Sequence, residues 1–243
     1  MQERYLGDSH DFVKYALLRH LHSETDMRIG VNWYLTNPEK VDDKNNNDGE
    51  KRHHLNGGAW QDWDKDLFSR IHKFEDPSVR RISMVGEFGL LPSNTLYFDP
   101  TVPIELRREW HHLGLSQLSK SDLVFLDPDN GFEVPSMKRS KTPKYALYSE
   151  ASDYLQSGKV VLGIQFARQC NPIQKGFIVR EQLLNVSGSQ EMLPIIRARV
   201  APNILFVAIS PSDKVSQITK AFESFAAGSP KMKSSGKRVE LIS

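Results

Sequence analysis

The feature of the sequence that most constrains the fold is a continuous apolar run, Val160-Val161-Leu162-Gly163-Ile164-Gln165-Phe166. Runs of this kind are typical of strands in a parallel sheet, because helices cover both faces of such a sheet. Residues 122–127 form a second run, which predicts another buried strand that ends in a polar turn. Both runs are shorter than the stretch of about 20 residues that spans a bilayer.

Stretches with helical spacing alternate with the predicted strands. Helices are predicted at residues 8–21, 64–73, 103–118, 148–156, 172–184 and 213–225. Strands are predicted at residues 29–35, 82–85, 96–98, 122–127, 160–166, 194–200 and 204–209. This order is typical of an α/β fold with a doubly wound, mostly parallel sheet and helices on both faces. A turn signal separates the last two strands, which we expect to form a C-terminal antiparallel hairpin.

The length of 243 residues suits one Rossmann-like α/β domain, which we place at residues 1–227. Residues 37–60 show no periodicity and predict a long loop, a kind of segment that is usually functional or disordered. Residues 228–243 are rich in lysine and serine and predict a flexible basic tail.

Composition excludes several classes of protein. A single cysteine, Cys170, excludes an internal disulfide and a cysteine-cluster metal site. No zinc-binding histidine motif occurs either, so we predict no bound metal. The 32 basic and 30 acidic residues leave a net charge of +2, which neither requires nor excludes nucleic acid. No signal peptide or membrane span is visible, so we expect a cytoplasmic protein without a membrane partner.

The turn after the strand at residues 122–127 is the strongest functional signal. It consists of Asp127-Pro128-Asp129-Asn130-Gly131-Phe132. Ligands of open α/β sheets bind beyond the carboxyl ends of the strands, where this turn lies. We therefore assign a catalytic role to Asp127, Pro128, Asp129 and Asn130. Phe132 is a candidate to stack on a planar base of the substrate. An ordinary sheet-to-loop turn is the alternative, since these residues are common turn formers.

The start of the first helix is the second signal. Asp8 is expected to cap this helix, with Asp11 in its first turn. Lys14 and Tyr15 follow as donors that could bind a phosphate or a carbonyl group of a substrate. The alternative is simple capping with an ion pair between Asp11 and Lys14.

A cofactor of the nucleotide type would lie at the end of the first strand, which carries Asn32, Tyr34 and Thr36. We assign these three residues, with Asp8 and Asp11, to cofactor binding. The usual phosphate-binding signatures, Gly-x-Gly-x-x-Gly and the P-loop, do not occur.

Two motifs together resemble a known family. The segment Gly7-Asp8-Ser9-His10-Asp11-Phe12-Val13-Lys14-Tyr15 is similar to the Gly-Asn-His-Ala-Asp-Val-Leu-Lys-His signature of the bacterial 23S ribosomal RNA adenine-N6 methyltransferases, the RlmJ family. The run Asp127-Pro128-Asp129-Asn130 resembles the Asp-Pro-Pro-Tyr motif of amino-methyltransferases, with Asp129 and Asn130 in place of proline and tyrosine. The terminal hairpin is also similar to the methyltransferase sheet.

The resemblance implies a Rossmann-like methyltransferase that uses S-adenosylmethionine to methylate an exocyclic amine of RNA or DNA. It implies that Asp127 and the Pro128 carbonyl accept hydrogen bonds from the target amine, and that an aromatic side chain holds the unstacked base. Lys14 matches the lysine of the family's opening signature, near the substrate or the cofactor.

Two other functions stay open. A nuclease or phosphodiesterase could hold Mg²⁺ with the carboxylates of Asp99, Asp127, Asp129 and Glu133, while Lys138 or Lys144 contacts the scissile phosphate. A non-catalytic domain could instead bind nucleic acid through basic residues. These are Lys138, Arg139, Lys141, Lys231, Lys233, Lys237 and Arg238.

Overall fold

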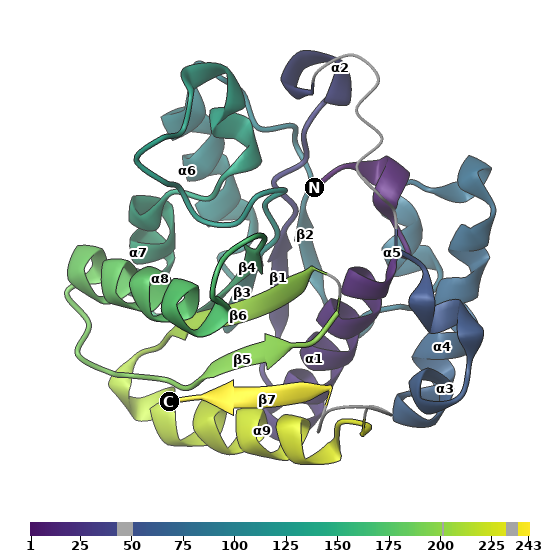
Figure 1. The fold of residues 1–243 in the computed structure, drawn as a ribbon. Coiled ribbons are helices and arrows are strands. Elements are labelled where there is room, and N and C mark those ends of the chain that lie inside the picture. Colours follow the sequence, from purple (N-terminus) through teal and green to yellow (C-terminus); the bar gives the residue numbers. More distant parts are fainter. Residues whose placement is uncertain (43–50, 201, 232–237) are drawn as a thin grey trace.

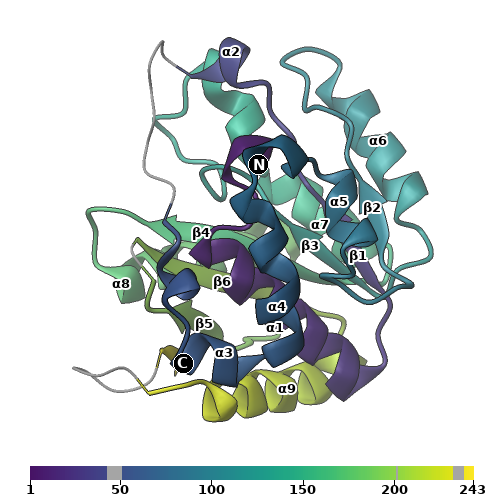
Figure 2. The ribbon, with the colours of Figure 1, turned by 90° about the vertical axis from the view of Figure 1, so that its right-hand side faces the viewer.

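The computed structural model describes residues 1–42, 51–200, 202–231 and 238–243 and shows an α/β fold (Figures 1 and 2). Its strands are β1 (Ile29–Asn32), β2 (Leu96–Phe98), β3 (Leu123–Leu126), β4 (Val160–Ala167), β5 (Ile195–Ala198), β6 (Asn203–Ile209) and β7 (Val239–Ile242). Its helices are α1 (Ser9–Thr25), α2 (Pro38–Val41), α3 (Ala59–Trp63), α4 (Lys65–Ile71), α5 (Ser83–Glu87), α6 (Arg107–Gln117), α7 (Tyr148–Gln156), α8 (Pro172–Ser187) and α9 (Val215–Gly228).

The described strands form one sheet in the order β2-β1-β3-β4-β6-β5-β7. The first four of these run parallel to one another, whereas β6 is antiparallel to β4 and β5, and β7 is antiparallel to β5. The predicted fold class and the antiparallel hairpin of β5 and β6 are therefore confirmed. The sheet order reverses between β1 and β3, because the chain leaves β1 for β2 on one side and returns to β3 on the other.

Two apolar cores, one on each face, explain why β3 is apolar throughout. Leu123 and Phe125 pack into the core that α1 and α9 cover, whereas Val124 and Leu126 pack into the core of α6, α7 and α8. Because successive side chains of a strand point to opposite faces, a strand that is covered twice needs apolar residues at every position. Figure 1 shows these two groups of helices on either side of the sheet.

Several predicted boundaries need correction. Residues 82–85 are predicted as a strand but belong largely to α5, where the buried Ile82 and Val85 are three residues apart on one helical face. The helix predicted from Pro103 begins only at Arg107. The first strand ends at Asn32, before Tyr34 takes a positive φ of 45°.

The described parts of the predicted loop and tail contain regular elements. Residues 37–60 include α2 and the beginning of α3, although residues 43–50 lie outside the described part of the chain. The predicted flexible tail includes β7, whose alternating apolar residues Val239 and Leu241 pair with Ala198 and Ile196 of β5. Among the described residues, no helix is both long and apolar enough to cross a membrane.

Gly163 allows an aromatic ring to lie directly on the sheet, and this gives a first prediction. A Cβ atom at Gly163 would stand 2.3 Å from Cζ of Phe132. We expect Gly163→Ala to lower the free energy of unfolding by about 1–3 kcal/mol, because overpacking displaces a buried ring. Urea unfolding measures the change. The control is Gly228→Ala, where a Cβ meets no atom within 4 Å; equal stability of the two variants would contradict the prediction.

Candidate functional site

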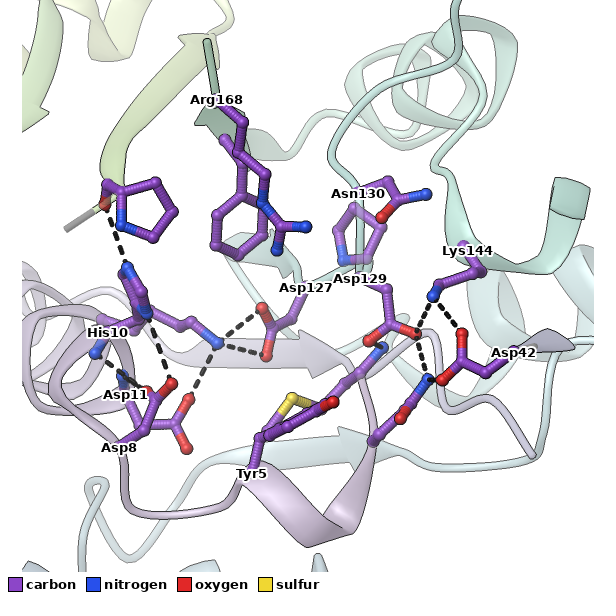
Figure 3. A pocket seen from close by; sticks show the side chains of 16 residues that line it. Tyr5, Asp8, His10, Asp11, Asp42, Asp127, Asp129, Asn130, Lys144 and Arg168 are labelled. Carbon is purple, nitrogen blue, oxygen red and sulfur yellow. Dashed lines mark hydrogen bonds and ion pairs between the residues drawn. The ribbon is translucent and has the colours of Figure 1, made fainter. Parts of the chain in front are cut away.

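A pocket lies at the carboxyl end of β3, beside the reversal of the sheet order (Figure 3). Its cavity of about 110 Å³ is small beside the 300–1,000 Å³ of typical ligand sites. The lining residues come from the N-terminal segment, α1, the end of α2, the end of β4 and the loops after β3, β4 and β5. They are Met1, Gln2, Tyr5, Asp8, His10, Asp11, Lys14, Asp42, Asp127, Pro128, Asp129, Asn130, Lys144, Phe166, Arg168 and Pro202.

The turn after β3 contributes all four predicted catalytic residues to the lining, Asp127 to Asn130. Asp127 continues the sheet, since its N–H donates to the carbonyl of Asn32 at 3.0 Å. Gly131 has a φ of 91°, which turns the chain away from the sheet. The buried Gln165 of β4 fixes this turn, because its Oε1 accepts from the N–H of Phe132 at 3.0 Å. The one polar residue of the predicted strand thus supports the candidate site.

The ammonium group of Lys14 joins α1 to the β3 turn. It lies 2.8 Å from Oδ1 of Asp11 and 2.9 Å from Oδ1 of Asp127, and the three side chains are almost fully buried. Asp127 therefore faces the pocket with a cation beside it. Asp8 caps α1 as predicted and accepts from the N–H groups of His10 and Asp11.

One ammonium group contacts two carboxylates in this cluster, with Asp8 close by, and the pKa values reflect the imbalance. Burial, together with the charges of Asp8 and Asp127, raises the pKa of Asp11 to about 6, although Lys14 opposes the shift. Burial disfavours the ammonium form of Lys14, but the surrounding carboxylates outweigh it and raise the pKa of Lys14. Asp11 is thus a buried carboxyl group that changes its charge between acid and neutral pH.

This shift predicts a pH dependence of stability. The folded protein keeps a proton on Asp11 that the unfolded chain loses near its ordinary pKa of 3.8. Stability from this group is therefore lost as pH rises from about 4 to about 6. Asp11→Asn should remove this loss, so that the stability of the wild type relative to the variant falls by roughly 2–3 kcal/mol across the window.

Urea unfolding at several pH values between 4 and 7 measures this difference. Asp213→Asn, at an exposed position, provides the control and should run parallel to the wild type. A parallel profile for Asp11→Asn would contradict the raised pKa of Asp11.

His10 forms a second contact between α1 and the sheet edge. Its Nε2 lies 3.0 Å from the Pro202 carbonyl, which can only accept, so this nitrogen carries a proton. Its Nδ1 lies 3.3 Å from Oδ2 of Asp8. Burial opposes ionisation of Asp8, but the hydrogen bond and charge of His10 outweigh it and lower the pKa of Asp8.

Asp129 and Lys144 line the side of the pocket that lies across from α1 (Figure 3). Oδ2 of Asp129 accepts from Thr36 at 2.8 Å and from Gln2 at 3.1 Å, while Oδ1 lies 3.1 Å from the amino group of Met1. Burial opposes ionisation of Asp129, but the amino group and Lys144 outweigh it and lower the pKa of Asp129. Lys144 lies 2.6 Å from Asp42, a carboxylate that the sequence analysis did not single out.

The remaining predicted cofactor residues do not face the pocket. Asn32 is buried and its Nδ2 donates to the hydroxyl of Tyr154 at 3.3 Å. Tyr34 is buried and donates to Glu150 at 2.8 Å, while Thr36 holds Asp129. The chain beyond β1 is also hydrogen-bonded to the protein itself, since the carbonyl of Leu35 accepts from the N–H of Val102.

The two aromatic residues predicted to bind substrate lie in the cores. Phe132 is 1% exposed and stacks on Tyr148, with ring centroids 5.2 Å apart. Tyr15 is fully buried next to Trp33, and its hydroxyl has no hydrogen-bond partner among the described residues. Neither ring lines the pocket, so in this structure neither can stack on a base there.

The predicted Mg²⁺ ligands do not gather at one point. Glu133 accepts from the N–H of Tyr148, and both oxygens of Asp127 contact Lys14. In the part of the chain that the structure describes, no group of three or more His, Cys, Asp or Glu side chains could hold a metal ion.

The predicted nucleic-acid contacts are also dispersed. Arg139 pairs with Glu105 at 3.3 Å, and Lys141 donates to the carbonyl of Val41 at 2.6 Å. Lys138 and Lys231 are exposed, while Arg238 lies over the ring of Trp60. Lys233 and Lys237 are outside the described residues.

Sequence reasoning missed Arg168 and Phe166, which complete the pocket. Phe166 lies near the end of β4 and Arg168 follows that strand, and the guanidinium of Arg168 lies 5.1 Å from the ring centroid of Phe166. The signal that could have found Arg168 is its position after a parallel strand that neighbours β3. No family model and no curated protein matches the sequence.

Proposed function

We propose that this protein is a Rossmann-like methyltransferase that uses S-adenosylmethionine to methylate an exocyclic amine of a nucleic acid. The observation that carries the proposal is the position of Asp127 and Pro128. They follow a central parallel strand, lie next to the reversal of the sheet order and line a pocket. The antiparallel β6 between β4 and β5 supports the same reading, because the terminal hairpin is part of the resemblance to the methyltransferase sheet.

The chemistry of Asp127 suits an amine. An ionised carboxylate only accepts hydrogen bonds and has about four lone-pair sites. Lys14 contacts both oxygens and fixes their orientation, and the remaining lone pairs can accept from the target N–H groups. Pro128 has no N–H, so its backbone offers only a carbonyl acceptor. Two acceptors on one amine increase its electron density and orient its lone pair.

The cofactor supplies an electrophilic methyl group when it is bound. Of the predicted cofactor residues, Asp8 and Asp11 line the pocket and offer acceptors for an amino group, whereas Asn32, Tyr34 and Thr36 are buried and do not fit that role. The small cavity suits the target amine and the atoms next to it. We therefore assign to this pocket the reacting groups and not the whole of either ligand.

Transfer of labelled methyl groups tests the proposal. Purified protein is incubated with S-adenosylmethionine labelled in its methyl group and with RNA or DNA, and the nucleic acid is digested to nucleosides. We expect label in an N-methylated base. Label in neither RNA nor DNA, with folded protein and fresh cofactor, would contradict the proposal.

A further inference from the structure

Each cation that lines the pocket in the described part of the chain has a carboxylate partner, with one exception. Lys14 serves Asp11 and Asp127, His10 faces Asp8, and Lys144 binds Asp42. The amino group of Met1 lies beside Asp129. Among the lining cations in the described part of the chain, Arg168 alone has no carboxylate within ion-pair distance, and this leaves a positive charge without a counterion at the pocket.

The local structure directs Arg168 toward the pocket. Its guanidinium lies over the half-buried ring of Phe166, and Figure 3 shows it pointing toward Asp127. A guanidinium on an aromatic face loses less freedom when it binds a ligand than one on a mobile side chain. Gln169 next to it has a φ of 51°, which is uncommon for a residue other than glycine and is often found at ligand sites.

The start of helix α8 does not offer an alternative anion site. Helix α8 begins close to Arg168, but Oδ1 of Asn171 already accepts from the first-turn N–H groups of Ile173 and Gln174. The side chain of Arg168 is therefore a better donor for an anion at this edge of the pocket than the first turn of α8. The guanidinium fork matches the two oxygens of a phosphate or a carboxylate.

We propose that Arg168 binds an oxyanion of one of the two ligands that meet at Asp127, the target nucleotide or the cofactor. This inference rests on the proposed function. It adds an anionic group that one of the two ligands has to carry. The oxyanion is either a phosphate of the target nucleotide or the carboxylate at the amino-acid end of the cofactor. Both have the same recognition chemistry, so matched probes have to separate them.

Binding of four probes, measured by calorimetry, separates the two sources. Adenosine monophosphate and adenosine differ by a phosphate. S-adenosylhomocysteine and 5′-methylthioadenosine differ by the amino-acid end. Each probe is titrated into the wild type, Arg168→Gln and Arg180→Gln. Arg180 is a matched control, because its guanidinium lies 5.0 Å from the ring centroid of Phe177, outside the pocket lining.

We expect Arg168→Gln to weaken binding of one anionic probe by roughly 10- to 100-fold, the effect of losing a charge-assisted hydrogen bond, and to leave its neutral counterpart unchanged. Arg180→Gln should match the wild type. A loss confined to the monophosphate assigns the phosphate, and a loss confined to S-adenosylhomocysteine assigns the carboxylate.

Equal effects of the two arginine variants on every probe would overturn the inference. Failure of both anionic probes to bind the wild type would also overturn it. Failure of the proposed function is distinguishable from this result. Monophosphate binding that depends on Arg168, in a protein that transfers no methyl group, would remove the methyltransferase proposal and leave the oxyanion site standing.

Discussion

Replacing Lys14 by methionine should lower the free energy of unfolding at pH 7 by about 3–5 kcal/mol, the usual effect of removing one partner from a buried ion pair. The variant leaves Asp11 and Asp127 buried without the cation that both contact. Two neighbouring carboxylates cannot both stay ionised at low cost, so the pKa of Asp11, already raised to about 6, should rise further.

The pH dependence of this loss gives the prediction its specificity. The folded variant takes up a proton below the raised pKa, so its stability should recover in part when the pH falls from 7 to 5. Urea unfolding at both pH values measures the effect, with Lys120→Met at an exposed position as the control. A loss below about 1 kcal/mol at pH 7 would contradict a cluster held together by Lys14.

Replacing Asp127 by asparagine should reduce methyl transfer by roughly 10²- to 10³-fold, as the loss of a single reacting-site hydrogen-bond partner does in other enzymes. The side chains have the same shape, but an amide has one acceptor and one donor group. Lys14 should hold the amide oxygen, because it donates to both oxygens of Asp127 in the wild type. The amide NH₂ then faces the target amine, a donor opposite a donor.

Initial rates of labelled methyl transfer measure this loss, and urea unfolding shows whether Asp127→Asn remains folded at the assay temperature. Asp213→Asn, which changes an exposed carboxylate to the same amide, should keep the full rate. If Asp127→Asn transfers methyl groups at a rate within about threefold of the wild type, the role given to this carboxylate is wrong.

The sequence predicts the sheet well because its strands are apolar on both faces. Residues 122–127 and 160–166 admit few other structures, and both become neighbouring parallel strands. The short run at residues 82–85 carries less information, since four residues with apolar ends fit one helical turn as well as a strand. Strand β7 was missed because its pairing with β5 depends on a distant segment.

The candidate site was predictable where it depends on local sequence. The capping role of Asp8 and the pairing of Asp11 with Lys14 follow from helix spacing. The contact between Lys14 and Asp127 joins residues that are 113 positions apart, so only the fold could show it. Tyr34 was assigned to a ligand because it follows a strand, whereas in the structure its hydroxyl donates to Glu150 and its ring lies next to Arg107.

The most direct test of the account is calorimetric titration of the folded protein with S-adenosylmethionine. We predict saturable binding at or below millimolar cofactor, with one molecule bound to each chain. Absence of binding at that concentration, in a sample whose unfolding transition shows it to be native, would contradict the central claim that the pocket at Asp127 serves methyl transfer.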